Sequence, residues 1–198
     1  MCLIAHKPAQ APLTDSDLDR IRVGYSNNPD GAGIMYPVSS GIRVIKGLMD
    51  VESLVHLLQS RDWTGTPLTV HCRIGTHGEN SPSNTHPFPI SGVYSDLRAT
   101  RLTCPVGLVH NGIITTPHDL VEGASDTMGF ISRYLAPLAR LGATTDQLAD
   151  IAGLTGSKFA LMGTGGDTTL VGTFSRAHGW YWSNESYKPR PAVTRPVV

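Results

Sequence analysis

The chain has no net charge that would attract a polyanion. Sixteen Lys and Arg residues balance sixteen Asp and Glu residues among 198, so the field of the whole chain would not draw it to nucleic acid or an acidic membrane surface. No apolar run approaches the roughly 18 residues of a membrane span, and no basic flank precedes an apolar stretch as in a secretory signal. These absences predict a cytoplasmic protein with no membrane and no nucleic-acid partner, whose partner is a small molecule or another protein.

Cysteine is scarce, and its spacing excludes a disulfide framework and argues against a zinc site. The three cysteines, Cys2, Cys72 and Cys104, are widely spaced and contain no CxxC pair. A chain of this length removes roughly 70 % of its unfolded surface from water, so it needs no covalent or metal staple. Cys72 and Cys104 are expected to be small buried apolar residues, which leaves Cys2 to be explained.

Histidine is more frequent, with eight copies, but the histidines and cysteines never reach zinc spacing. We therefore expect no metal site. His71 and His110 lie within apolar strand patterns and are predicted to be hydrogen-bonded core residues. Surface or loop positions are expected for His6, His56, His118 and His178.

No internal repeat or low-complexity linker divides the chain, so one domain is the simplest organisation. Short runs of β-branched or aromatic residues bounded by Gly and Pro are predicted to be strands. They are Cys2–Ala5, Gly33–Tyr36, Ile42–Ile45, Leu68–Cys72, Gly107–His110, Phe159–Met162, Thr168–Gly172 and Trp180–Trp182. The Pro-rich stretch 187–198 is predicted to leave the core as an extended tail, either loose or used for docking, so the domain is expected to span residues 1–186.

Helical patterns lie between these runs. Thr14 and Asp50 can each cap a helix, and Ser125 can cap a third helix that Pro137 should kink or shorten. The apolar face of the third helix would consist of Met128, Ile131, Leu135 and Leu138. Many strands and few helices, without strict alternation of the two, predict an α+β domain with layered sheets in place of a doubly wound parallel sheet.

Cys2 is the first residue that points to chemistry. A small side chain at position two permits removal of Met1, which would leave a cysteine with a free α-amino group. The thiol is a strong nucleophile as thiolate, and an α-amine with a pKa of about 7.7–8.0 can accept a proton near neutral pH. Taken alone, Cys2 is better explained as the start of a buried strand, so its assignment as a nucleophile depends on the rest of the chain.

A loop rich in hydrogen-bond donors follows the strand predicted at Leu68–Cys72. It reads Arg73-Ile74-Gly75-Thr76-His77-Gly78, and Asn84-Thr85-His86-Pro87-Phe88 follows shortly after. Its glycines allow a ligand to approach the backbone closely. Arg73 carries the planar fork that binds a carboxylate through two parallel hydrogen bonds, with a surface ion pair as the alternative.

Two further segments supply an amide and a carboxylate. His110-Asn111-Gly112 places an amide beside a glycine at the end of an apolar run, where a side-chain N–H and a backbone N–H can point at one oxygen. Read in isolation, Asn111-Gly112 is a hairpin turn. Asp126, within Ser125-Asp126-Thr127, could pair with a substrate ammonium group or simply belong to a helix N-terminus.

Taken in this order, these segments resemble the class II glutamine amidotransferase domain of the N-terminal nucleophile hydrolase superfamily. The resemblance runs from Cys2 to about Asp126 and resumes weakly at residues 183–187. The segments that carry it are Met1-Cys2, Asn28-Pro29-Asp30-Gly31-Ala32-Gly33, Arg73 to Gly78 with Asn84 to Phe88, His110-Asn111-Gly112 and Ser125-Asp126-Thr127. Gly75 departs from the pattern, since many relatives have Ala there.

The resemblance implies a four-layer α/β/β/α sandwich with Cys2 at the end of an inner strand. It implies that Cys2 attacks the amide carbon and that Asn111 and Gly112 form the oxyanion hole. Arg73 would hold the substrate α-carboxylate, and Asp126 would hold its α-ammonium group. Thr76 and His77 would line the pocket near the same end, with support from Gly75, Gly78 and His86.

The hypothesis that follows is hydrolysis of the side-chain amide of glutamine. The Cys2 amine, directly or through a water, would take the thiol proton, and the sulfur would attack the δ-carbonyl. Ammonia would leave, and water would then cleave the γ-glutamyl thioester. This chemistry needs no cofactor.

The destination of the ammonia stays open at this stage. Amidotransferases normally carry a second domain that consumes it, and 198 residues leave no room for one, so a separate synthase is expected to act in trans. Two alternatives remain. The chain could be a free-standing hydrolase of another γ-glutamyl amide, or a binding or structural module that retains Met1 and is catalytically silent. The sequence specifies neither the acceptor nor the oligomeric state.

Overall fold

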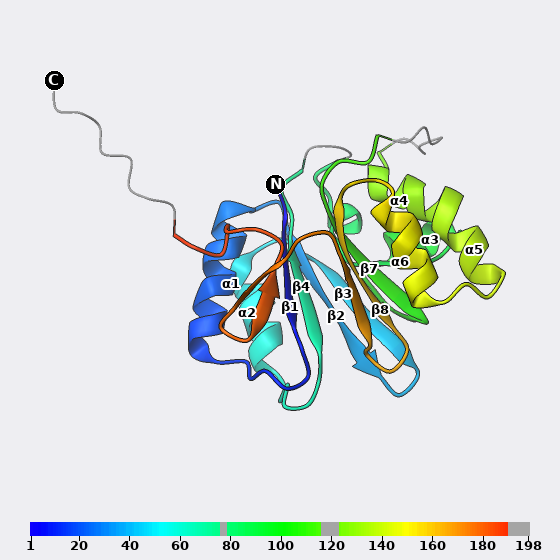
Figure 1. The fold of residues 1–198 in the computed structure, drawn as a ribbon. Coiled ribbons are helices and arrows are strands. Elements are labelled where there is room, and N and C mark those ends of the chain that lie inside the picture. Colours follow the sequence, from blue (N-terminus) through cyan, green and yellow to red (C-terminus); the bar gives the residue numbers. More distant parts are fainter. Residues whose placement is uncertain (76–78, 116–122, 190–198) are drawn as a thin grey trace, which may run out of the picture.

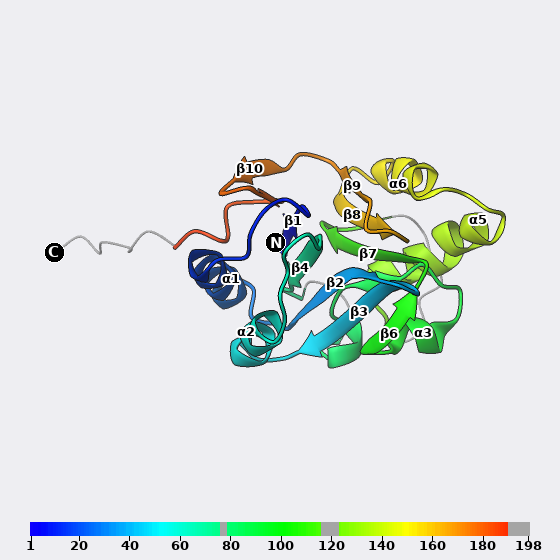
Figure 2. The same cartoon turned by 90° about the horizontal axis from the view of Figure 1, so that it is seen from below.

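The strands form two antiparallel sheets in the computed structural model, which describes residues 1–75, 79–115 and 123–189 (Figures 1 and 2). The seven-stranded sheet has the order β10-β11-β1-β4-β2-β3-β6, and the four-stranded sheet has the order β5-β7-β8-β9. In chain order the strands are β1 (Leu3–Lys7), β2 (Ala32–Val38), β3 (Gly41–Leu48), β4 (Leu68–Cys72), β5 (Phe88–Pro89), β6 (Arg101–Cys104), β7 (Val106–Asn111), β8 (Lys158–Gly163), β9 (Thr168–Val171), β10 (Ser175–Ala177) and β11 (Trp180–Trp182).

Helices cover the outer face of each sheet. Helices α1 and α2 lie against the larger sheet, and α4, α5 and α6 lie on the far side of the smaller sheet (Figures 1 and 2). The helices are α1 (Asp15–Asn27), α2 (Val51–Gln59), α3 (Tyr94–Arg98), α4 (Asp126–Phe130), α5 (Ala136–Arg140) and α6 (Thr145–Gly153), with a 3-10 turn at Pro82–Asn84 and a π-helical turn at Ile131–Leu135.

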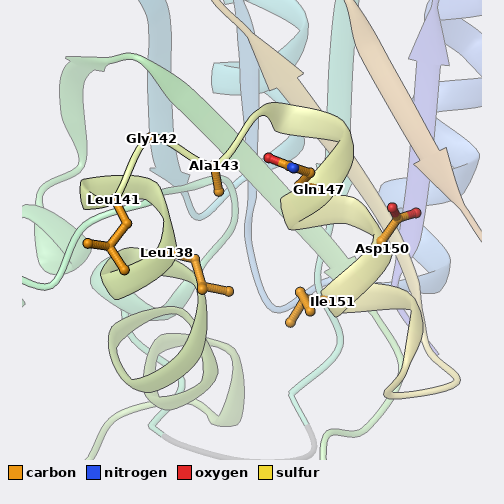
Figure 3. A pocket seen from close by; sticks show the side chains of 7 residues that line it. All are labelled: Leu138, Leu141, Gly142, Ala143, Gln147, Asp150 and Ile151. Atoms are coloured by element: carbon orange, nitrogen blue, oxygen red, sulfur yellow. The ribbon is translucent and has the colours of Figure 1, made fainter.

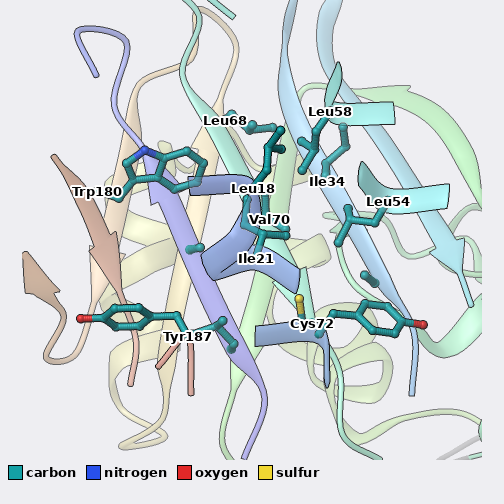
Figure 4. Close-up of a cluster of buried hydrophobic side chains, with 14 of the residues drawn as sticks. Leu18, Ile21, Ile34, Leu54, Leu58, Leu68, Val70, Cys72, Trp180 and Tyr187 are labelled. Atoms are coloured by element: carbon teal, nitrogen blue, oxygen red, sulfur yellow. The ribbon is translucent and has the colours of Figure 1, made fainter. Parts of the chain in front are cut away.

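Three clusters of buried apolar side chains pack between the sheets and helices that the structure describes. One core lies between the larger sheet and α1 and α2, where Leu18 and Leu54 meet strand residues such as Val70 (Figure 4). A second core fills the space between the sheets and contains Ile4 and Val109. The third lies between the smaller sheet and its helices. The predicted α+β class is confirmed.

The predicted caps begin the helices where the sequence placed them. Thr14 and Asp17 form a reciprocal capping box at α1, and Asp50 accepts a hydrogen bond from the Ser53 backbone N–H at 2.7 Å. Helix α6 was not predicted, although Thr144 and Gln147 form the same kind of capping box in front of it. The S/T-x-x-E/Q pattern at residues 144–147 was the signal that could have located this helix.

The third predicted helix continues past Pro137 to Arg140, so the expected shortening is wrong. The helical path runs through α4, the π-helical turn at Ile131–Leu135 and α5. Proline has no N–H for an α-helical hydrogen bond, and the change of bonding pattern directly before Pro137 lets the helix continue. The apolar face is as expected, with Met128, Ile131 and Leu135 buried and Leu138 packed against them.

Several strand predictions need correction. Strands β5, β6 and β10 were not predicted, because they are short and lie at or near sheet edges. Strand β1 begins at Leu3 and extends to Lys7, so His6 is a buried strand residue with 6 % of its surface exposed, and the surface or loop position expected for it is wrong. The burial expected for Cys72, Cys104, His71 and His110 is confirmed.

The packed part of the chain extends at least to Tyr187, the first residue of the predicted tail. Tyr187 is 4 % exposed, and its ring stacks on Trp182 with centroids 4.2 Å apart. Residues 190–198 lie outside the described part of the chain. Among the helices that the structure describes, none combines the length and the apolar character needed to cross a membrane.

Candidate active site

The alternation of side chains along three strands brings Cys2, Asn111 and Lys158 to the same end of the space between the sheets. Along β1, Leu3 faces the helices and Ile4 faces the second sheet, so Cys2, two residues before Ile4, points to the inter-sheet side. Asn111 shares its face of β7 with Val109, which lies in the inter-sheet core. Lys158 is the register partner of Asn111 at the start of β8.

These residues line one cavity of about 420 Å³. Cys2, Asn111 and Gly112, which were predicted to act in catalysis, all contribute to its wall. The rest of the lining consists of Met1, Ile74, Ile113 and residues 155–158. Met1 is 80 % exposed, so the N-terminus lies at the mouth of this cavity in reach of solvent.

The Cys2 sulfur is held by the backbone of Ile74. The Ile74 N–H donates to Sγ at 3.4 Å, and the thiol donates to the Ile74 carbonyl at 3.5 Å. Burial raises the pKa of the Cys2 thiol, while the Ile74 N–H, the N-terminal ammonium and the Arg73 charge partly offset that rise. The sulfur is therefore kept as a thiol near neutral pH and needs a base to become a nucleophile.

Arg73 follows β4 directly and is 4 % exposed, so the surface ion pair considered from the sequence does not describe it. Its guanidinium donates to the side-chain oxygen of Asn80 at 3.2 Å and to the Glu79 carbonyl at 3.4 Å. Asp30 completes the arrangement by accepting from the Gly75 N–H at 2.7 Å and from the Asn80 amide at 3.2 Å. These contacts fix the direction of the guanidinium.

Gly75 leaves room for the Arg73 side chain. A Cβ added at Gly75 would lie 3.0 Å from one guanidinium nitrogen and 3.1 Å from the other. An alanine at this position would therefore require the guanidinium to shift by a few tenths of an ångström. The absence of a side chain at residue 75 is thus coupled to the position of Arg73.

Asn111 is the last residue of β7 and Gly112 follows it, and the two do not form the hairpin turn that is usual for this dipeptide. The strand paired with β7 at this end is β8, which begins at Lys158, far along the chain. Asn111 is 4 % exposed, its Nδ2 lies 3.0 Å from Ser183 Oγ, and its Oδ1 has no partner among the described residues. Gly112 has a φ of 153°, which favours glycine.

Asp126 is the first residue of α4, behind the Ser125 cap that the sequence predicted. Its carboxylate accepts from the Ile114 N–H at 2.9 Å and from the Thr127 N–H at 2.8 Å. Asp126 therefore ties the chain after Gly112 to the helix, and it does not line the 420 Å³ cavity. The Thr127 hydroxyl donates to the same carboxylate at 3.3 Å. Two carboxylate oxygens offer about four acceptor sites, so these three contacts from described residues leave one site for an ammonium group.

His86 belongs to a buried group of histidines. Its Nε2 lies 3.3 Å from Thr127 Oγ1, which also lies 2.9 Å from His110 Nδ1. The rings of His71 and His86 have centroids 4.3 Å apart, and His71 Nε2 contacts the His110 carbonyl at 2.9 Å. Burial lowers the pKa of each of these histidines. The supporting role expected for His86 remains a prediction, with Thr127 as its neighbour.

Three predicted site residues, Thr76, His77 and Gly78, lie outside the described residues. Sequence reasoning in turn assigned no role to Ser183, Asn184 and Lys158. Asn184 donates to the Cys2 carbonyl at 2.7 Å, and Lys158 Nζ donates to the Ser183 carbonyl at 2.5 Å. The weak resemblance at residues 183–187 was a signal for the first two, whereas only the pairing of β8 with β7 places Lys158.

A larger cavity of about 590 Å³ lies between α5 and α6 (Figure 3). It is lined by Leu138, Leu141, Gly142, Ala143, Gln147, Asp150 and Ile151. Volume alone would favour it as a ligand site. It holds no nucleophile and no convergent donors, however, so the chemistry favours the smaller cavity beside Cys2.

Within the described residues, no group of three or more His, Cys, Asp or Glu side chains is arranged to hold a metal ion. Comparison with known protein families and with curated proteins finds no match. The candidate site therefore rests on the residues and their geometry.

Proposed function

We propose that this chain is a glutaminase of the class II glutamine amidotransferase type, which hydrolyses the side-chain amide of glutamine with Cys2 as nucleophile. One observation carries the proposal. Cys2, the Asn111 amide and Gly112 line a single cavity, and Cys2 Sγ contacts the residue that directly follows Arg73. A nucleophile, two oxyanion donors and a carboxylate-binding guanidinium are the groups that this reaction requires.

The proposal includes the four-layer α/β/β/α sandwich of an N-terminal nucleophile hydrolase. Two features support it. The three apolar cores occur in the order that helices, sheet, sheet and helices require. In addition, β1 is an interior strand, with β11 on one side and β4 on the other, and Cys2 stands immediately before it.

The proposed reaction begins once Met1 has been removed. The free α-amine of Cys2 takes the thiol proton, and the sulfur bonds to the δ-carbon of glutamine. The Asn111 amide and the Gly112 N–H stabilise the negative oxygen. The amine returns the proton to the leaving nitrogen, ammonia departs, and water hydrolyses the γ-glutamyl thioester to glutamate and free thiol.

Substrate binding is assigned to Arg73 and Asp126. Arg73 would hold the α-carboxylate, and Asp126 would hold the α-ammonium group. We further propose that a separate synthase consumes the ammonia. A protein that co-purifies with the chain and raises glutamine turnover would support such a partner.

The central test combines mass and activity. Intact-mass analysis of the purified chain should show loss of one methionine, and this form should release ammonia from glutamine and react at Cys2 with the glutamine analogue diazo-oxo-norleucine. Cys2→Ala should abolish both activities, whereas Cys104→Ala, which removes a thiol remote from the cavity, should retain them. Undiminished ammonia release by Cys2→Ala would rule out the assignment.

A further inference from the structure

Ser183 lies directly after β11 and is 2 % exposed. Its backbone N–H donates to the Ile4 carbonyl at 2.9 Å, and its Oγ accepts from the Ile4 N–H at 2.9 Å. Ser183 therefore hydrogen-bonds to both backbone polar groups of Ile4, which lies two positions after Cys2 on β1. The same Oγ lies 3.0 Å from the Asn111 amide.

The number of hydrogen bonds that the Ser183 hydroxyl can donate and accept determines whether the oxygen or the nitrogen of the Asn111 amide faces it. A serine hydroxyl has one hydrogen to donate and two sites that accept. The Ile4 N–H fills one accepting site. If Asn111 Nδ2 fills the other, the hydroxyl hydrogen has no recorded acceptor among the described residues, and Asn111 Oδ1 stays buried without a partner.

Turning the amide by half a rotation removes both deficits. The Ser183 hydroxyl then donates to Asn111 Oδ1, while the Ile4 N–H keeps its acceptor. The oxygen and nitrogen of a carboxamide have nearly the same shape, so the turn leaves the packing unchanged. The Asn111 NH₂ group then takes the buried position now held by Oδ1, where no partner is present among the described residues, so its hydrogens stay available for a developing negative oxygen.

We propose that Ser183 is a positioning residue, which holds the Asn111 carbonyl so that the Asn111 NH₂ group faces the cavity beside Cys2. This inference rests on the proposed function. The neighbouring contacts fit it: Asn184 donates to the Cys2 carbonyl at 2.7 Å, and Lys158 Nζ donates to the Ser183 carbonyl at 2.5 Å. The segment 183–184 thus joins the nucleophile, the oxyanion amide and the start of β8.

The position of one hydrogen tests the geometry without any activity measurement. Neutron diffraction from a deuterium-exchanged crystal should show deuterium on Ser183 Oγ directed at Asn111 Oδ1. Deuterium on Asn111 Nδ2 directed at Ser183 Oγ would overturn the inference. This result stands even if the processed chain releases no ammonia, an outcome that would refute the proposed function alone.

Kinetics test the role. Ser183→Ala should lower kcat for glutamine by at least about tenfold, a part of the roughly 10²–10³-fold cost of losing an oxyanion donor, with KM changed by less than about threefold. Ser183→Thr, which keeps the hydroxyl, should recover most of kcat. The matched control is Ser175→Ala, because Ser175 is exposed on β10 and its hydroxyl contacts the Trp182 carbonyl and not Asn111.

A double-mutant cycle separates positioning from general structural support. In the Asn111→Ala background, Ser183→Ala should lower kcat by less than about twofold, because the amide that it orients is gone. A full multiplicative loss in that background would show that Ser183 acts on the fold as a whole and would overturn the positioning role.

Discussion

The sulfur of Cys2 contacts two backbone atoms of Ile74, the nitrogen at 3.4 Å and the carbonyl oxygen at 3.5 Å. The N–H contact stabilises a thiolate, whereas the carbonyl contact holds the hydrogen of the neutral thiol. Because burial is the largest influence and raises the pKa of Cys2, the neutral thiol prevails near neutral pH. Under the proposed mechanism, the α-amine that removal of Met1 would expose activates this thiol.

The pH profile of glutamine hydrolysis should therefore rise with pH. The amine can accept the thiol proton only when it is itself neutral, so kcat/KM should increase about tenfold per pH unit below the amine pKa of about 7.7–8.0 and level off above it. The measurement is ammonia release by the processed chain across this range. A flat profile down to about pH 5.5 would contradict the amine as base. The form that retains Met1 is the control and should be inactive, since its Cys2 nitrogen is an amide.

Replacing Arg73 with lysine should weaken glutamine binding more than it slows the reaction. Lysine keeps the charge but loses the planar fork, and a hydrogen bond to a charged group contributes about 1.5–3 kcal/mol. KM should rise about 10- to 100-fold, while kcat changes by no more than a few-fold. Arg101→Lys, at an exposed position on the edge strand β6, is the matched control. An unchanged KM in Arg73→Lys would show that Arg73 does not bind the substrate carboxylate.

The stability of the fold should fall as the pH drops below about 6.5. Burial lowers the pKa of His6 to about 4, of His71 to about 3 and of His110 to about 4, from an ordinary value of 6.5. As the pH falls from about 6.5 toward these lowered pKa values, the histidines bind protons in the unfolded chain but stay neutral in the folded chain. The free energy of unfolding therefore decreases. Each such histidine should contribute about 1 kcal/mol per pH unit between pH 6 and 5.

His6→Gln isolates one of these histidines. Glutamine can keep the contact that His6 Nδ1 makes with Thr69 Oγ1 at 3.0 Å, but it does not titrate. Urea unfolding measures the free energy of unfolding at each pH. Between pH 6 and 5, the slope of this free energy against pH should be smaller than in the parent chain by the equivalent of about one proton. His56→Gln, at an exposed position on α2, is the matched control. An undiminished slope in His6→Gln would mean that His6 is protonated in the folded chain.

The strands and the helix starts were predictable where the sequence carries a local signal. The run Leu68–Cys72 is a strand with the predicted bounds, because each of its residues is buried and β-branched or apolar residues dominate it. Thr14 and Asp50 marked helix starts because a cap is a contact within a few residues. The order of the strands carries no such local signal and depends on tertiary pairing.

The same distinction applies to the site. Cys2 and Asn111 were recognisable by residue type and order, but Ser183 and Lys158 reach them only through the pairing of β11 with β1 and of β8 with β7. His6 was expected at the surface or in a loop, beyond a strand predicted to end at Ala5. Strand β1, however, is interior to its sheet and has packed faces on both sides, so its polar residues are buried as well.

Gly112→Ala should damage both the fold and the reaction. A Cβ at Gly112 would lie 2.3 Å from Ser157 Oγ and 2.8 Å from Ser157 Cβ, and the φ of 153° disfavours any other residue. Overpacking and backbone strain should together destabilise the fold by about 2–4 kcal/mol, as measured by urea unfolding. Displacement of the residue-112 N–H from the oxyanion position should lower kcat at least tenfold.

Two further variants separate the steric cost at Gly112 from the backbone cost. Gly156 also has a positive φ, 73°, but a Cβ there meets nothing within 4 Å, so Gly156→Ala should cost only the backbone part, about 1–2 kcal/mol. Ser157→Gly combined with Gly112→Ala removes the atoms that the new Cβ would strike and should recover the overpacking part, leaving the strain. If Gly112→Ala were as stable as Gly156→Ala and kept its kcat, the close approach of Ser157 to residue 112 would not constrain the oxyanion hole. If the double variant recovered stability but not kcat, the reaction would depend on the backbone conformation of residue 112 and not on the space around it.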